Sequence, residues 1–150
     1  YIMVGGMVMA YLGGLHFWWP KISGRMYNEK LGQFSAAIIF IGFNLTFFPQ
    51  FILGYLGMPR RYPIYPPEWQ VFNVLSSAGA SILALGYALP LCYLTWSFFF
   101  GRRAPQNPWQ ASGLEWTNTS SPPIRANFVE MPIVTREAYD YPYPETAHDA

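Results

Sequence analysis

Two adjacent arginines, Arg60 and Arg61, are the residues whose type and spacing point most directly to chemistry. They follow a long apolar run and stand between Pro59 and Pro63, two residues that restrict the backbone around them. Guanidinium groups stay charged and bind carboxylates or phosphates through paired hydrogen bonds. The pair therefore predicts an anion site near a membrane surface. Its ligand is either a lipid headgroup or the carboxylates of a buried cofactor, and position alone favours the headgroup.

Apolar helices must position this pair, because charged residues are scarce and unevenly placed. Lysine, arginine, aspartate and glutamate make up 11% of the 150 residues, whereas soluble domains carry about 25%. Residues 1–20, 31–59 and 69–101 contain no charged side chain, and each run reaches the roughly 20 residues that cross a bilayer as a helix. This pattern predicts an all-α integral membrane protein. It excludes an ordinary soluble domain, a disordered chain and a nucleic-acid binder.

The chain divides into a membrane part and a tail. Three transmembrane helices are expected within residues 1–103, at about 1–19, 34–56 and 74–100. Residues 104–150 hold seven of the 14 prolines and no apolar run of helix length. This composition predicts an extended tail that lies along other protein surface.

Basic residues near the span ends predict the orientation in the membrane. Five of them follow the first and third spans: Lys21, Arg25, Lys30, Arg102 and Arg103. The positive-inside rule places the first loop and the tail on the cytoplasmic or matrix side. Arg60 and Arg61 then stand alone on the other side, where they need a functional explanation.

The residues around the arginine pair form two strings, NLTFFPQ at residues 44–50 and GMPRRY at residues 57–62. Flanking strings include GGLHFWWP at residues 13–20, SSAG at residues 76–79 and LEW at residues 114–116. Together they closely resemble subunit I of cytochrome c oxidase, in the haem–copper oxidase superfamily. The resemblance covers most of the chain and thins in the last part of the tail.

The resemblance implies that the three spans are helices ten to twelve of a twelve-helix bundle. It implies that Arg60 and Arg61 bind the propionates of a low-spin and of a high-spin haem A. It also implies copper in the complete subunit, and an enzyme that reduces O2 to water with electrons from cytochrome c and pumps protons. The implied partners are the remainder of subunit I, subunit II with its dinuclear copper, subunit III, cytochrome c and membrane lipids, with no nucleic acid.

The family's metal ligands are expected outside this chain. In the family, a His-x-His pair that ligates the two haem irons immediately precedes the position matching Tyr1, and the copper ligands lie further upstream. The resemblance therefore implies no catalytic residue and no metal ligand in this fragment. Helical spacing from that pair would put Met3, Val4, Met7 and Val8 toward the low-spin haem. Ordinary helix packing explains the same four residues equally well.

Two other functions stay open on the sequence. One is a non-catalytic membrane scaffold of the same ancestry, and the other is an unrelated three-span transporter component. The intact Arg60–Arg61 pair favours the oxidase over the scaffold, and a transporter usually shows an intramembrane charge or a broken-helix repeat. The expected location is an energy-transducing inner membrane, with the bacterial plasma membrane favoured and the mitochondrial inner membrane possible. The apolar start without an initiator methionine predicts a fragment, a processed product or a split subunit.

Overall fold

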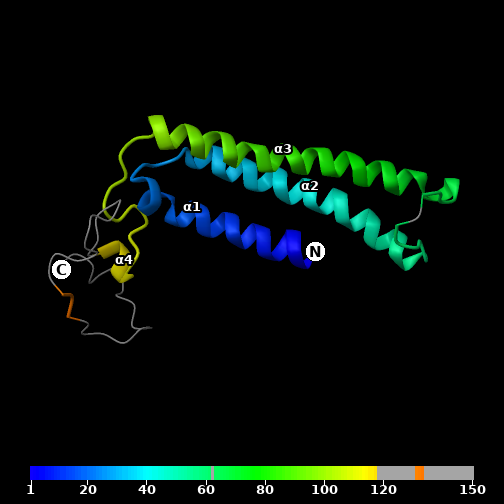
Figure 1. Cartoon of the computed structure of the whole chain (residues 1–150), viewed down its shortest axis with the longest axis horizontal. Coiled ribbons are helices and arrows are strands. Elements are labelled where there is room, and N and C mark those ends of the chain that lie inside the picture. The colour runs from blue at the N-terminus through cyan, green and yellow to red at the C-terminus, as the bar shows by residue number, and fades with distance from the viewer. Residues whose placement is uncertain (62, 118–130, 134–150) are drawn as a thin grey trace. The chain divides into compact units, whose positions relative to one another are not determined.

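The computed structural model describes residues 1–61, 63–117 and 131–133 (Figure 1). In chain order its elements are the π-helix η1 (Ile2–Val8), α1 (Met9–Ser23), α2 (Glu29–Tyr55), the 3-10 helix η2 (Pro67–Trp69), α3 (Gln70–Phe100) and α4 (Leu114–Thr117). They fall into two compact units, which we describe separately. Unit 1 comprises residues 1–15 and 27–101, and unit 2 comprises residues 16–26 and 102–150.

Three helical segments are long and apolar enough to cross a membrane, namely Ile2–Ser23, Glu29–Tyr55 and Pro67–Phe100. The expectation of an all-α membrane fragment is therefore confirmed. The helices extend beyond the charge-free runs, and α2 starts at Glu29 rather than near residue 34. Its start is fixed by Asn28, whose side-chain oxygen accepts hydrogen bonds from the backbone N–H groups of Lys30 (3.1 Å) and Leu31 (3.4 Å).

The tail contains a short helical element in the part that the structure describes. Residues 104–113 form no helix, and α4 adds one helical turn over Leu114–Thr117. The extended tail was expected over residues 104–150, and of these, residues 118–130 and 134–150 lie outside the described residues.

Helices α2 and α3 pack side by side in unit 1, and glycines permit their close approach (Figure 1). A Cβ atom added at Gly42 would lie 2.5 Å from the backbone nitrogen of Leu83. A Cβ atom added at Gly79 would lie 2.5 Å from the backbone nitrogen of Thr46. Real side chains cannot occupy these positions without moving the backbone, so the two helices require glycine at both contacts.

Two serine hydroxyls cross the same interface. Ser35 Oγ donates to the carbonyl oxygen of Gly86 at 3.0 Å, and Ser76 Oγ donates to the carbonyl oxygen of Thr46 at 2.8 Å. Both serines are buried, with 1% and 8% of their surface exposed. Hydrogen bonds of this kind satisfy polar groups in an apolar setting and add to the packing between helices. These two hydrogen bonds hold α2 and α3 together, and the loop with Arg60 and Arg61 connects these helices.

The first span begins with a π-helix that lies against α2. The backbone N–H of Gly6 donates to the carbonyl oxygen of Tyr1 at 3.1 Å, five residues earlier. The Tyr1 ring meets the Phe43 ring edge-on, with 4.8 Å between centroids. A Cβ atom added at Gly5 would lie 2.5 Å from Phe43. The glycine therefore lets this segment approach the aromatic surface of α2.

Unit 2 has an aromatic centre of its own. Trp116 of α4 is fully buried, and the Lys21 ammonium lies 5.1 Å from the centre of its ring. Phe17 meets Trp116 edge-on and stacks on Trp109, with ring centroids 5.2 and 6.2 Å apart. The Trp109 indole N–H donates to the backbone carbonyl of Phe17 at 2.9 Å. The segment after α3 thus packs onto the last turns of α1.

Candidate functional site

The arginine pair follows an abrupt helix end. Beyond Tyr55, Gly57 has a φ of +89°, a conformation that glycine adopts without steric cost. The Gly57 N–H donates to the Gly54 carbonyl at 3.2 Å, and the Met58 N–H donates to the Leu53 carbonyl at 2.9 Å. These two bonds make a Schellman motif, which satisfies the last carbonyls of α2 and turns the chain sharply. The loop that carries the arginines therefore starts from a fixed point.

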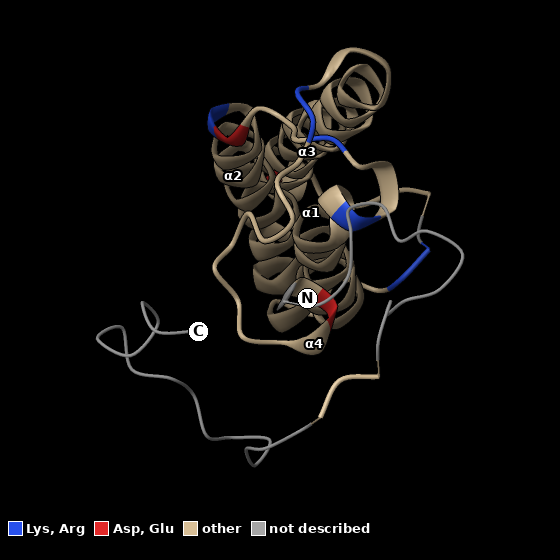
Figure 2. Cartoon of the chain, turned by 90° about the vertical axis from the view of Figure 1, so that its left-hand side faces the viewer, with Lys and Arg blue, Asp and Glu red and all other residues tan. Residues whose placement is uncertain are grey.

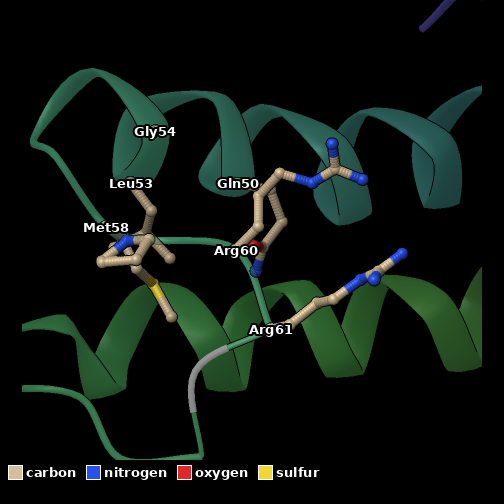
Figure 3. Close-up of a pocket in the computed structure, with 7 residues that line it drawn as sticks. Gln50, Leu53, Gly54, Met58, Arg60 and Arg61 are labelled. Atoms are coloured by element: carbon tan, nitrogen blue, oxygen red, sulfur yellow. The ribbon is translucent and has the colours of Figure 1, made fainter.

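Arg61 itself adopts a left-handed backbone conformation, with a φ of 59°. This conformation is uncommon for a residue other than glycine, and it persists only where the surrounding structure enforces it. Figure 3 shows the result, because the Arg60 and Arg61 side chains extend from the loop in the same direction, back over α2 and α3. The two charges are thus directed along the membrane-spanning helices rather than away from them.

The two guanidinium groups border an open cavity of about 430 Å³. Its lining residues are Gln50, Leu53, Gly54, Met58, Pro59, Arg60 and Arg61 (Figure 3). No carboxylate belongs to this lining, and among the described residues neither arginine has a hydrogen-bond or ion-pair partner. Both arginine side chains are exposed in this chain. The cavity can therefore accept an anionic group that brings its own carboxylates or phosphates.

Asn73 of α3 contacts both walls of this cavity. Its Oδ1 accepts a hydrogen bond from Gln50 Nε2 at 3.4 Å, and its Nδ2 lies 4.0 Å from the sulfur of Met58. The same Nδ2 donates to the Trp69 carbonyl at 3.0 Å, which fixes the amide on its own helix. Asn73 was not predicted from the sequence to support the loop. Its amide stands at the start of the third span, and no sequence pattern indicates that it contacts Gln50 and Met58.

The four residues expected to face the low-spin haem lie on η1 and do not share one environment. Met3 and Met7 are 68% and 65% exposed. Val4 and Val8 are half-buried, and Val4 packs against the core around Phe43. The expectation used the spacing of an α-helix, with 3.6 residues per turn, whereas this segment is π-helical. Met3 and Met7 are consequently the two members that this chain leaves open to another group.

Metal-ligating residues do not cluster in the part of the chain that the structure describes. Over the described ranges, no three histidine, cysteine, aspartate or glutamate side chains come together in a way that could hold a metal ion. The candidate site built here is instead cationic. Two guanidinium groups in such a lining are able to bind an anion and neutralise its charge.

The described residues contain three helical segments that are long and apolar enough to cross a membrane, which defines an integral membrane protein. Comparison with known proteins narrows this class. The family described as "Cytochrome C and Quinol oxidase polypeptide I" matches residues 1–82. The chain belongs to this family.

The curated relatives agree with this family membership. Cytochrome c oxidase subunit 1 of Synechocystis sp. is 45% identical over 94% of the chain and 25% of the relative. Heme-copper oxidase subunit I+III of Aeropyrum pernix is 44% identical over 91% of the chain and 17% of the relative. Putative cytochrome c oxidase subunit 1-beta of Streptomyces avermitilis is 41% identical over 100% of the chain and 28% of the relative. The chain thus spans between 17% and 28% of the length of these relatives.

Proposed function

We propose that the chain is part of the catalytic subunit of a cytochrome c oxidase, in which Arg60 and Arg61 hold the propionates of the haems. The enzyme reduces O2 to water with electrons from cytochrome c and pumps protons. Family membership and the identities of 40–45% to cytochrome c oxidase subunits support the first part of the proposal. The geometry of the arginine loop supports the second.

One observation carries the role of the arginine pair. Both guanidinium groups extend back over the spanning helices and line a cavity without an acidic residue. A lipid headgroup would lie at the level of the loop, whereas a cofactor between helices would lie where these side chains point. A haem brings two carboxylates, whose burial is costly unless cations and hydrogen-bond donors receive them. Each guanidinium offers five donors in a planar fork that matches a carboxylate.

The residues of this chain would bind, orient and tune the group, while a bound haem supplies one-electron chemistry at its iron. Arg60 and Arg61 keep the propionates ionised and fix their place at the end of α2. Their positive charge also favours the state with one more electron, so it raises the reduction potential of the haem they contact. Asn73 and Gln50 hold the loop against α3. The apolar faces of α2 and α3 limit access of water.

The iron and copper ligands are assigned to the remainder of subunit I, so the isolated chain is expected to bind no haem. Met3 and Met7 on η1 are the part of this chain that we assign to the face of the low-spin haem, because they are exposed here. The assembly would include subunit II with its dinuclear copper and subunit III. Its location would be an energy-transducing inner membrane, and the bacterial plasma membrane is favoured.

The substitution Arg61→Leu in the complete complex tests this function. A hydrogen bond to a charged group contributes about 1.5–3 kcal/mol, and about 60 mV corresponds to 1.4 kcal/mol for one electron. We expect the potential of the low-spin haem to fall by on the order of 60 mV and turnover to slow. Spectroelectrochemical titration of the purified enzyme measures the shift.

Lys30→Leu is the matched control, because it also removes one positive charge and Lys30 does not line the cavity. Its haem potentials are expected to equal those of the unaltered enzyme. Unchanged potentials and turnover in Arg61→Leu would remove the support for a propionate-binding role. Stoichiometric haem on the isolated chain would show that iron ligands lie within it.

A further inference from the structure

We infer that Ser76 of α3 is a positioning residue for the arginine pair, because it binds α2 at the turn that Pro49 weakens. The inference rests on the proposed function only where it concerns the haem. Its structural part concerns what directs the last turns of α2, and that part can be tested separately.

Proline interrupts both helices of the α2–α3 pair. Pro49 lies inside α2 and Pro90 lies inside α3, and both are buried. A proline within a helix has no N–H, so the carbonyl four residues before it loses its helical donor and the helix can bend there. The two carbonyls concerned belong to Leu45 and Gly86. Each helix therefore has one weak turn inside its membrane-spanning segment.

A serine of α2 binds at the weak turn of α3. Ser35 Oγ donates to the Gly86 carbonyl at 3.0 Å, and this is the carbonyl that Pro90 leaves without its helical donor. Ser35 is buried, with 1% of its surface exposed. Its hydroxyl thus takes the place of the missing N–H from across the helix interface, as side chains of neighbouring helices do at prolines in membrane proteins.

The weak turn of α2 receives the corresponding support from α3. Ser76 Oγ donates to the Thr46 carbonyl at 2.8 Å, one residue beyond the carbonyl that Pro49 leaves without its helical donor. Gly79 brings the α3 backbone to the same turn, since an added Cβ would lie 2.5 Å from the carbonyl carbon of Leu45. In each helix the proline follows the serine by about four turns. The α3 helix therefore contacts the α2 backbone where the helical bonding of α2 is interrupted.

The part of α2 beyond Pro49 leads to the loop that carries the arginines. This part supplies three of the residues that line the cavity beside the arginine pair, namely Gln50, Leu53 and Gly54 (Figure 3). The carbonyls of Leu53 and Gly54 also accept the two hydrogen bonds that start the loop. A change of the bend at Pro49 therefore moves the cavity wall and the start of the loop together.

Uncharged groups make the polar contacts between these two helices. Helix α3 contains no charged side chain, and those of α2 are Glu29 and Lys30 at its start (Figure 2). Near the loop, the Ser76 hydroxyl binds at 2.8 Å, whereas Gln50 Nε2 donates to Asn73 Oδ1 at 3.4 Å. The shorter bond is the stronger one. Of these two contacts, the one from Ser76 therefore contributes more to the direction of the last turns of α2.

Hydrogen–deuterium exchange of the complete complex tests the structural part. Ser76→Ala removes the hydroxyl at the turn before Pro49. It is expected to speed exchange of the backbone amides of residues 50–58 about fivefold, the factor that corresponds to one uncharged hydrogen bond. Ser35→Ala is the matched control, because it removes the equivalent bond at the weak turn of α3. It is expected to leave residues 50–58 unchanged and to speed exchange in residues 91–101. Equal exchange of residues 50–58 in the two variants would overturn the inference.

Redox titration of the same variants tests the consequence for the haem. The potential of the low-spin haem is expected to fall in Ser76→Ala and to stay unchanged in Ser35→Ala, while thermal denaturation shows a similar loss of stability in both. A shift in Arg61→Leu without one in Ser76→Ala would overturn the positioning role. Failure of the proposed function is distinguishable, because Arg61→Leu would then also leave the potential unchanged while the difference in exchange persists.

Discussion

The two arginine pairs of this chain are positioned by different means. Arg60 and Arg61 are neighbours in the sequence, and a helix end together with two unusual backbone conformations directs them. Arg25 and Arg103 belong to separate segments, and two long-range main-chain hydrogen bonds place them opposite each other. In both cases the backbone conformation sets where the two arginines stand.

The two arginine pairs therefore depend on different parts of the chain. The loop pair depends on α2 and α3, since the loop connects these helices and Asn73 of α3 contacts its wall. The bridge pair depends on backbone hydrogen bonds within unit 2 and on the turn at Gly24, which has a φ of +70°. Damage to the α2–α3 interface should therefore affect the first pair and leave the second in place.

The largest effect is expected from Gly79→Ala. The added Cβ would lie 2.5 Å from backbone atoms of Leu45 and Thr46, so α2 and α3 must separate. Overpacking of this kind costs about 1–3 kcal/mol. We expect the complex to release haem at a lower temperature than the unaltered complex, as measured by thermal denaturation.

Gly13→Ala is the control for that substitution, because within 4 Å a Cβ added at Gly13 meets no described atom beyond its chain neighbours and its own helix backbone. The thermal stability of the Gly13→Ala complex should match that of the unaltered complex. Equal stability of the Gly79→Ala and Gly13→Ala complexes would show that the glycine contact does not hold the loop.

A smaller effect is expected from Asn73→Ala, which tests whether α3 helps to position the loop. The substitution removes the contacts of α3 with Gln50 and Met58 and leaves both arginines intact. A neutral hydrogen bond contributes about half as much as one to a charged group, so the low-spin haem potential should fall by less than about 30 mV. Asn44→Ala is the control, because within the described part of the chain the Asn44 amide donates to the Phe40 carbonyl of its own helix, at 2.9 Å. Identical titrations for the two variants would mean that the loop backbone alone positions the arginines.

The arginine pair could be predicted from the sequence, but its direction could not. The amino-acid sequence itself shows two positive charges after a long apolar run, between Pro59 and Pro63. The direction of their side chains depends on φ angles at Gly57 and Arg61, which follow from the packing of the whole loop. Position alone favoured a headgroup ligand, whereas the direction of the side chains favours a cofactor between the helices.

The three spans were predictable because each charge-free apolar run is at least as long as a helix that crosses a bilayer. The helix type within a span and the pairing of distant segments were not predictable. The π-helical bonds of η1 leave its hydropathy unchanged, so the sequence predicts α-helical spacing there, and the place of Met3 and Met7 beside the low-spin haem stays a prediction. The bridge between Arg25 and Arg103 joins distant segments, and no local pattern in either segment predicts the other.

The most direct test of the central claim is a redox-induced infrared difference spectrum of the complete complex with isotope-labelled haem propionate carboxyl groups. The unaltered complex is compared with Arg61→Lys, which keeps the charge and loses the planar fork of donors. If Arg60 and Arg61 hold the propionates, the labelled carboxylate bands shift in Arg61→Lys and stay unchanged in Lys30→Arg. Labelled bands that are identical in the unaltered and Arg61→Lys complexes would contradict the claim.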